Sequence, residues 1–292
     1  MRSLLFVPAD SERKLAKGAA VGADALILDL EDAVAPDRKP AARAMATEYL
    51  KAARQQAQRP RLYVRINSLD TGMLEADLSV IAGAPDTILL PKAQGGEDVQ
   101  RLALALDNAE QKHGLPLGAT RITVLTTEVP ISMLDMRSYV GSSTRLEGLT
   151  WGAEDLGAMM GVKSNRAADG RAWTSPFRLA RDLCLVTAVA AGVAPIDTIF
   201  ANFRDAEGLR IEAGEAARDG FTAKMAIHPD QVAVINAAFT PTPEEVAHAQ
   251  AVVRVFADNP GAGALALDGQ MLDRPHLVNA ERILARAAAR PA

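Results

Sequence analysis

Two acidic residues near the middle of the chain come shortly after apolar stretches. Glu128 follows the apolar stretch at 122–125, and Asp155 follows the apolar stretch at 146–150. Two carboxylates that leave room for water and ligand oxygens suit Mg²⁺, a hard ion that usually keeps few protein ligands. Glu128 and Asp155 are therefore candidate metal ligands. In the alternative interpretation, both are solvent-facing acids or helix caps.

Two basic residues, Arg65 and Lys92, end apolar stretches in the same way. A guanidinium at a strand end can hold a carboxylate at two points, so Arg65 is a candidate substrate-binding residue, and Lys92 is a second one. Each has a structural alternative. Arg65 could form an ion pair with a nearby acid, and Lys92 could offset the charge of Glu31 or Asp32 in an inward-facing network.

Arg13 and Lys17 lie four residues apart on one face of a predicted helix that follows Ser11. The amino end of a helix with two cations on one face can bind a phosphate, although ordinary solvated charges are the commoner explanation. The histidines lack metal-binding spacing. Only His228 is well placed after a predicted strand, where it also fits an ordinary loop residue. Cys184 is typical of a small buried residue within a helix.

Elements that would position these residues follow a repeating order along the chain. Strand-like segments are predicted at 3–7, 24–29, 61–66, 86–90, 120–126, 146–150, 195–200 and 221–226. Helical patterns are predicted at 11–20, 38–58, 71–82, 97–113, 131–138, 176–191, 206–218 and 229–238. Eight of each predict an α/β protein with a (β/α)₈ TIM barrel, whose carboxyl strand ends carry the chemistry. A doubly wound sheet is disfavoured because no glycine-rich fingerprint follows the first strand.

The chain beyond the eighth repeat has a different pattern. Residues 1–240 are predicted to form the catalytic barrel, and residues 241–292 a C-terminal helical extension packed on the barrel or on a neighbouring subunit. A helix is expected from about 240 to 257 and another over 276–288. Within the barrel, Lys163–Ser175 has few apolar anchors and is predicted to be a long loop over the mouth.

Composition excludes several classes of function. A net charge of −4 without a run of Lys or Arg gives no support for binding to nucleic acid or a membrane surface. No apolar window is long enough to span a membrane. The opening Met1–Pro8 is predicted as the first strand rather than a signal peptide, because its apolar run is short and charges follow it. A single cysteine favours a reducing compartment, the cytoplasm.

An ordered set of motifs resembles the citrate lyase β-subunit family, the CoA-ester lyases that group with the HpcH/HpaI aldolases. The matching segments are Arg2-Ser3-Leu4-Leu5-Phe6-Val7-Pro8, Leu28-Asp29-Leu30-Glu31-Asp32-Ala33-Val34, Val64-Arg65-Ile66-Asn67, Leu90-Pro91-Lys92, Gly152-Ala153-Glu154-Asp155-Leu156 and Lys224-Met225-Ala226-Ile227-His228-Pro229. Each motif alone is weak, but the ordered set is specific and extends over most of the chain.

The resemblance implies a Mg²⁺-dependent homotrimer or hexamer. Such an enzyme cleaves or forms the carbon–carbon bond of a short 3-hydroxy-acyl-CoA, such as citryl-, malyl- or citramalyl-CoA, and its small-molecule partners are the CoA thioester and its keto-acid product. It also implies roles for particular residues. Metal ligation falls to Glu128 and Asp155, binding of the substrate carboxylate to Arg65, binding of the CoA phosphates to Arg13 and Lys17, and proton exchange to Asp273, in its own or a neighbouring subunit's site.

Two positions depart from the family pattern. The family usually has a hydrophobic residue, Glu and Thr around the first metal ligand, whereas this chain has Thr127-Glu128-Val129; and Ala9 stands where relatives often have Gly. The sequence leaves three alternatives open: a CoA-free aldolase of pyruvate-type enolates, a malyl-CoA thioesterase on the same fold, and a non-catalytic acyl-thioester-binding subunit of a citrate lyase complex. The acyl group is not fixed by the fold.

Overall fold

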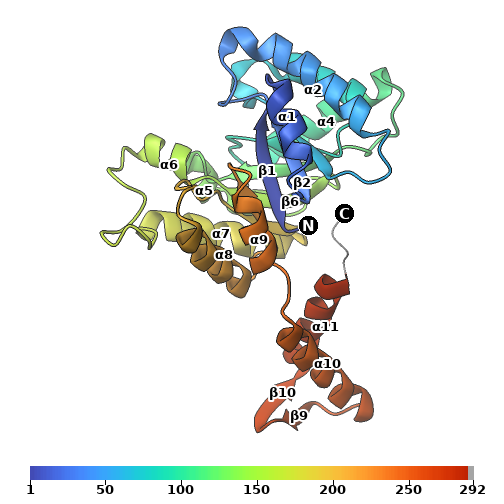
Figure 1. The fold of residues 1–292 in the computed structure, drawn as a ribbon, viewed down its shortest axis with the longest axis vertical. Coiled ribbons are helices and arrows are strands. Elements are labelled where there is room, and N and C mark those ends of the chain that lie inside the picture. Colours follow the sequence, from blue (N-terminus) through green and yellow to red (C-terminus); the bar gives the residue numbers. More distant parts are fainter. Residues whose placement is uncertain (289–292) are drawn as a thin grey trace. The chain divides into compact units, whose positions relative to one another are not determined.

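The computed structural model describes residues 1–288 and divides the chain into two compact units, of which the first is Met1–Asn236 and the second begins at Ala237 (Figure 1). Within the described residues, no helix is long and apolar enough to cross a membrane.

The first unit is built around a closed barrel of eight parallel strands, which confirms the predicted (β/α)₈ fold. Each strand pairs with the next along the chain, and the first pairs with the eighth to close the ring. The strands are β1 (Ser3–Pro8), β2 (Ala25–Asp29), β3 (Arg61–Arg65), β4 (Thr87–Leu90), β5 (Arg121–Thr126), β6 (Leu146–Trp151), β7 (Ala194–Asp197) and β8 (Ala223–Ala226). Because all eight run in one direction, their carboxyl ends meet at one mouth.

Inward-facing side chains fill the barrel, as expected of strands in which alternate residues face opposite sides. These residues form one buried cluster: Leu4, Ala25, Ile27, Tyr63, Leu89, Leu125, Ile196, Ala223 and Met225. The outward-facing residues of the same strands are buried under helices, so the strands are apolar on both faces.

Helices follow the strands on the outside of the barrel. The longer ones are α1 (Glu12–Ala19), α2 (Lys39–Ala53), α4 (Gly96–Lys112), α6 (Ala153–Met160), α7 (Ser175–Ala191), α8 (Ala206–Asp219) and α9 (Gln231–Ala238). Shorter turns are η1 (Pro36–Arg38), η2 (Leu69–Thr71), α3 (Leu74–Asp77), η3 (Leu78–Gly83), α5 (Pro130–Leu134) and η4 (Met136–Tyr139). Ser11 caps α1 through its side-chain oxygen, as the sequence predicts.

Two predicted helices are broken into short pieces. The segment expected to be helical over 71–82 is interrupted at Gly72, whose φ of 72° is left-handed, and continues as α3 and η3. The helix expected over 131–138 changes to a tighter turn at Asp135. The helix expected over 38–58 ends at Ala53, several residues before Pro60.

The second unit consists of α10 (Pro243–Asp258), a two-stranded hairpin of β9 (Ala264–Leu267) and β10 (Gln270–Asp273), and α11 (Arg274–Ala288). The two helices agree with the expected ones, but the hairpin was not predicted. Its two-residue loop is Asp268-Gly269, with φ of 51° and 79° at the two positions. Asp-Gly favours such a turn, so the sequence contained a cue for this hairpin.

Candidate active site at the barrel mouth

A cavity of about 250 Å³ opens at the carboxyl ends of the strands. Its polar lining includes Arg65, Glu128 and Asp155, which the sequence singled out, together with Asp29, and the cavity also has an apolar wall. The wall residues are Phe6, Leu125, Ile199, Met225 and Ile227. The two acids predicted as metal ligands, which follow β5 and β6, therefore line a single cavity.

Glu128 is held in place by the backbone around it. It follows Thr127, whose φ of 65° is unusual for a β-branched residue and whose N–H donates to Ser132 Oγ at 2.9 Å. Glu128 Oε2 accepts the backbone N–H of Lys92 at 2.7 Å, and Lys92 is itself left-handed with φ of 50°. The side chain is 2% exposed. Burial raises its pKa to about 8, and the nearby Asp155 and Glu31 act in the same direction.

Gly152 allows the Glu128 side chain to lie against the end of β6. A Cβ at position 152 would lie 2.5 Å from Glu128 Cγ and 3.0 Å from its Oε1. Because the backbone of Gly152 is extended, close approach explains the glycine better than backbone conformation does. Three residues later, Asp155 lies in the first turn of α6 with a partly exposed side chain.

Arg65 lies between two buried acids. Its Nε and one terminal nitrogen donate to the two oxygens of Asp29 at 2.7 and 2.6 Å, and the other terminal nitrogen lies 2.9 Å from Glu31. Burial alone would lower the pKa of Arg65, but its bonds with these acids raise it above its ordinary value. The structural ion pair considered for Arg65 is thus present. A guanidinium has five N–H groups, so donors remain for a ligand in the cavity.

Asp29 is a site residue that the sequence reasoning did not single out. It ends β2 and lies two residues before Glu31, so both could be expected to approach the same neighbour. The strand-end position that drew attention to Glu128 was also a cue for Asp29.

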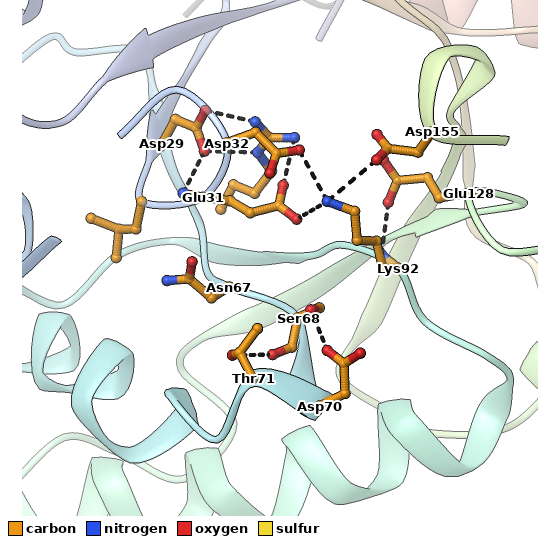
Figure 2. A network of polar contacts seen from close by, with 12 residues as sticks. Asp29, Glu31, Asp32, Asn67, Ser68, Asp70, Thr71, Lys92, Glu128 and Asp155 are labelled. Carbon is orange, nitrogen blue, oxygen red and sulfur yellow. Dashed lines mark hydrogen bonds and ion pairs between the residues drawn. The ribbon is translucent and has the colours of Figure 1, made fainter. Parts of the chain in front are cut away.

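Lys92 links the acids from the other side, as Figure 2 shows. Its ammonium lies 2.6 Å from Glu31, 3.0 Å from Asp32 and 3.4 Å from Asp155. The pKa of Lys92 is raised: although burial lowers it, the bond to Glu31 and the neighbouring acids outweigh that effect. The expected compensation of Glu31 and Asp32 by Lys92 is therefore present, and Asp155 joins the same network.

A buried lysine holds the loop after β2 in place. Lys39 Nζ donates to the backbone oxygens of Leu30 and Glu31 at 2.8 and 2.9 Å, and to Asn67 Oδ1 at 2.6 Å. Asn67 in turn donates to Asp77 from its backbone and side chain. The position of Glu31 is therefore fixed by groups that do not line the cavity.

A second cavity of about 530 Å³ contains Arg13 and Lys17 of α1 together with His228. It shares Phe6, Pro8 and Ile227 with the first cavity, so the two are neighbours within the same unit. The His228 ring stacks on Phe203 with 4.9 Å between ring centres. Arg13, Lys17 and His228 thus line one cavity, and the binding of phosphate by the two cations stays a prediction.

Asp273 lies in the second unit, at the end of β10. Its Oδ1 is 2.6 Å from His276 Nδ1, and both side chains are exposed. Asp273 belongs to the second unit and the cavity residues belong to the first, so its catalytic role stays a prediction.

The donor set of the mouth fits a hard divalent cation. The described residues contain no cluster of three or more His, Cys, Asp or Glu side chains suited to a metal. Glu128 and Asp155 alone would leave most coordination positions to water and ligand oxygens, which is the usual arrangement for Mg²⁺. Figure 2 shows their carboxyl groups directed to the same space, and a cation there would offset both the burial and the repulsion from Asp155 and Glu31 that raise the pKa of Glu128.

A closed parallel barrel with acids and a buried arginine gathered at its carboxyl mouth defines this unit as a (β/α)₈-barrel enzyme. The chain belongs to the HpcH/HpaI aldolase/citrate lyase family, which matches residues 2–229. Aldolases and citrate lyases both break or form carbon–carbon bonds, so the enzyme is of the carbon–carbon lyase class.

Three relatives illustrate the similarity. The mitochondrial citramalyl-CoA lyase of Rattus norvegicus is 32% identical and covers 98% of this chain and 86% of its own. The (3S)-malyl-CoA thioesterase of Cereibacter sphaeroides is 35% identical, with coverage of 99% and 95%. A crystal structure of protein CitE from Mycobacterium tuberculosis with magnesium, acetoacetate and coenzyme A is 35% identical, has a TM-score of 0.80, and covers 99% of this chain and 98% of its own.

Proposed function

We propose that this protein is a Mg²⁺-dependent CoA-ester lyase that cleaves or forms the carbon–carbon bond of a short 3-hydroxy-acyl-CoA. The observation that carries the proposal is the convergence of Glu128, Asp155 and Arg65 on one cavity that also has an apolar wall. Relatives named for acting on citramalyl-CoA and malyl-CoA support it, as does one bound to magnesium and coenzyme A.

Glu128 and Asp155 would hold the metal ion at the mouth. The chemistry that Mg²⁺ supplies when bound is a lower pKa of the substrate hydroxyl and stabilisation of negative charge on its oxygen. Arg65 would bind the carboxylate next to that hydroxyl with the donors that Asp29 and Glu31 leave free. Because these two acids fix the plane of the guanidinium, the carboxylate is oriented before reaction.

The bond changes follow from this placement. The hydroxyl loses its proton to a water molecule at the mouth as the bond between the hydroxyl-bearing carbon and the thioester α-carbon breaks. The electron pair of that bond passes to the thioester as an enolate, and the other fragment becomes a keto acid. Asp273 would deliver a proton to the α-carbon and give acetyl-CoA, or remove one in the condensation direction. Arg13 and Lys17 would bind the CoA phosphates in the adjoining cavity.

The cavity favours an acyl group with one carboxylate. Among the described residues that line it, Arg65 is the only cation, whereas four carboxylates and an apolar wall make up much of the rest. A malyl or citramalyl group would place hydrogen or a methyl group against that wall. The extra carboxymethyl group of a citryl substrate would instead lie against apolar side chains or face other acids, which is unfavourable.

The proposal is tested by mixing the purified protein with malyl-, citramalyl- and citryl-CoA, with and without EDTA. We expect EDTA to stop turnover, Mg²⁺ to restore it, and citryl-CoA to have a kcat/KM at least about tenfold below the best substrate, equivalent to about 1.4 kcal/mol. Glu128→Gln should lose most activity, while Glu97→Gln on the exposed face of α4 should retain it. Turnover that persists in EDTA, or full activity of Glu128→Gln, would contradict the mechanism.

Malyl-CoA thioester hydrolysis is a second candidate, favoured by the similarity to the (3S)-malyl-CoA thioesterase. The products separate the two, because a lyase releases glyoxylate with acetyl-CoA whereas a thioesterase releases malate with free CoA. A CoA-free aldolase is separated by replacing Arg13 and Lys17 with Ala, which should raise KM strongly only for a CoA ester. A purely binding subunit would give calorimetric heat with CoA esters but no product.

A further inference from the structure

A closed ring of side chains lies behind one wall of the cavity. Its six members are Arg166, Trp173, Trp151, Asp197, Lys224 and Glu212, and each contacts the next. They come from the segment between α6 and α7 (Arg166 and Trp173), the ends of strands β6 and β7, strand β8, and helix α8. The ring therefore joins a long connecting segment to three neighbouring strands of the barrel.

The polar half of the ring is centred on a buried lysine. Lys224 Nζ donates to Asp197 Oδ2 at 2.6 Å and to Glu212 Oε1 at 2.9 Å. The indole N–H of Trp151 donates to the other oxygen of Asp197 at 2.8 Å. Trp151, Asp197 and Lys224 are each at most 1% exposed. Because an unpaired polar group is costly in such surroundings, each of these side chains is held on its hydrogen-bond partners.

The aromatic half connects this centre to the 163–175 segment. Arg166 forms an ion pair with Glu212 at 2.6 Å and places its guanidinium 3.2 Å from the centre of the Trp173 ring. Trp173 then meets Trp151 edge to face, with 4.9 Å between ring centres. The segment predicted to be a loop over the mouth is thus attached at both Arg166 and Trp173.

Every strand residue of the ring is followed by a residue that lines the cavity. Trp151 precedes Gly152, Asp197 precedes Thr198, and Lys224 precedes Met225. Neighbouring residues of a strand face opposite sides, so the ring lies outside the barrel wall and the cavity lies inside it.

Gly152 lets this outer ring affect the metal ligands. It contacts Glu128 closely enough to exclude a Cβ, and it leads directly into the first turn of α6 with Asp155. A shift of Trp151 would therefore move Gly152 against Glu128 and move the start of α6.

We propose that this ring positions the two metal-binding acids and couples the order of the 163–175 segment to cation binding. The inference rests on the proposed function, because it assumes that Glu128 and Asp155 bind Mg²⁺. Arg166 and Trp151 are then positioning residues, which act through Gly152 without touching substrate. Groups that orient metal ligands in this way typically change metal affinity by about 10- to 100-fold when they are altered.

The tryptophans provide a direct readout, because the chain contains only two and both belong to the ring. We expect titration of the full chain with MgCl₂ to change the tryptophan emission, with a midpoint equal to the Kd measured by calorimetry. Neither measurement requires turnover.

Two variants test the coupling against a matched control. Arg166→Met removes the ion pair and the stacking, and Trp151→Phe removes the indole N–H but keeps an aromatic edge. Each should weaken the calorimetric Kd for Mg²⁺ at least about tenfold. Arg171→Met changes an exposed arginine of the same segment and should behave like the unaltered protein. Thermal melting checks that all three variants are folded.

The outcomes are distinguishable. Variants with a lower Tm but an unchanged Kd for Mg²⁺ would show a structural role only and overturn the coupling. A wild-type emission that does not respond to bound Mg²⁺ would also overturn it. If calorimetry detects no binding of Mg²⁺ to the unaltered protein, the proposed metal site itself is contradicted, and the coupling with it.

Discussion

The charged residues at the mouth form a network of ion pairs, of which the sequence allowed only part to be predicted. Strand-end placement is visible in the sequence, so Glu128, Asp155, Arg65 and Lys92 could be selected from their types and neighbours. The pairing of Lys92 with Glu31 and Asp32 could also be suggested, but the pairing of Arg65 with Asp29 could not, because it depends on the register between strands. Lys39 was missed for another reason: it lies on a helix, where a lysine is ordinarily solvated, yet its ammonium is buried on two backbone oxygens.

At this scale, Gly152→Ala should damage the site while leaving the fold intact. The new Cβ would meet Glu128 Cγ at 2.5 Å, so the carboxylate must move, although the extended backbone at position 152 tolerates alanine. We expect a fall in kcat/KM of about 100-fold, equivalent to about 2.7 kcal/mol, with a loss of unfolding free energy of about 1–3 kcal/mol. Steady-state kinetics and urea denaturation provide the two measurements.

Gly157→Ala is the matched control for that substitution. A Cβ at Gly157 in α6, the helix that begins just after Gly152, would meet only ordinary contacts, the nearest at 3.5 Å from Val162. We expect Gly157→Ala to have normal activity and Gly152→Ala to have a strongly reduced kcat/KM. Equal activity of the two variants would show that the position of Glu128 does not depend on Gly152.

At the scale of elements, hydrophobic stretches located the strands well because each is buried on both faces. The irregular connections were harder to predict. The pieces that replace the expected helix over 71–82 depend on a left-handed Gly72 and on Asp77, which is buried where it binds Asn67 and Arg43. Buried polar partners that lie far apart in the sequence leave no local periodicity, so pattern alone cannot find them.

One such partner gives a prediction about stability and pH. Glu110 of α4 is buried, pairs with Arg145, and accepts the backbone N–H groups of Gly118 and Thr120. Burial alone would raise the pKa of Glu110, but these bonds hold it below its ordinary value. Glu110→Gln would remove the buried counter-charge of Arg145 and leave it paired with Asp107 alone, so we expect a loss of about 1–3 kcal/mol of unfolding free energy at pH 7.

The sign of the pH effect follows from the direction of that shift. A carboxyl with a lowered folded-state pKa stabilises the protein above its ordinary pKa, about 4.3, and this contribution disappears as the pH falls through the folded value. The stability difference between wild type and Glu110→Gln should therefore shrink between about pH 5 and 3. Urea denaturation at several pH values measures it, with Glu97→Gln of the same helix as control. A difference that stays constant with pH would contradict the assignment.

At the scale of the whole molecule, the chain divides into a barrel with Glu128 and Asp155, the proposed metal ligands, and a second unit with Asp273. The division near residue 236 arises because α10 and α11 pack on each other around their own small core. The apolar pattern of these helices was visible in the sequence. How many copies assemble, and which copy receives Asp273, requires contacts between chains and stays a prediction of a homotrimer or hexamer.

That prediction can be tested by complementation. If Asp273 acts in a neighbouring subunit's site, then Glu128→Gln and Asp273→Asn should each be nearly inactive alone. Mixed after dissociation and reassembly, they should regain a fraction of wild-type activity, because some sites would combine an intact Glu128 with an intact Asp273 from another copy. No recovery in verified mixed oligomers would indicate that Asp273 serves its own chain's site. Analytical ultracentrifugation provides the oligomer size and checks that mixing occurred.

The seam between the first and eighth strands has a consequence for biosynthesis. Phe6 and Ile227, which border both cavities, come from opposite ends of the barrel sequence. The ring closes only when β8 pairs with β1. A nascent chain leaving the ribosome therefore has neither pocket until more than three quarters of it has been translated. Early termination anywhere before this seam would abolish catalysis and cofactor recruitment together, and would expose the unpaired edge of β1 to aggregation.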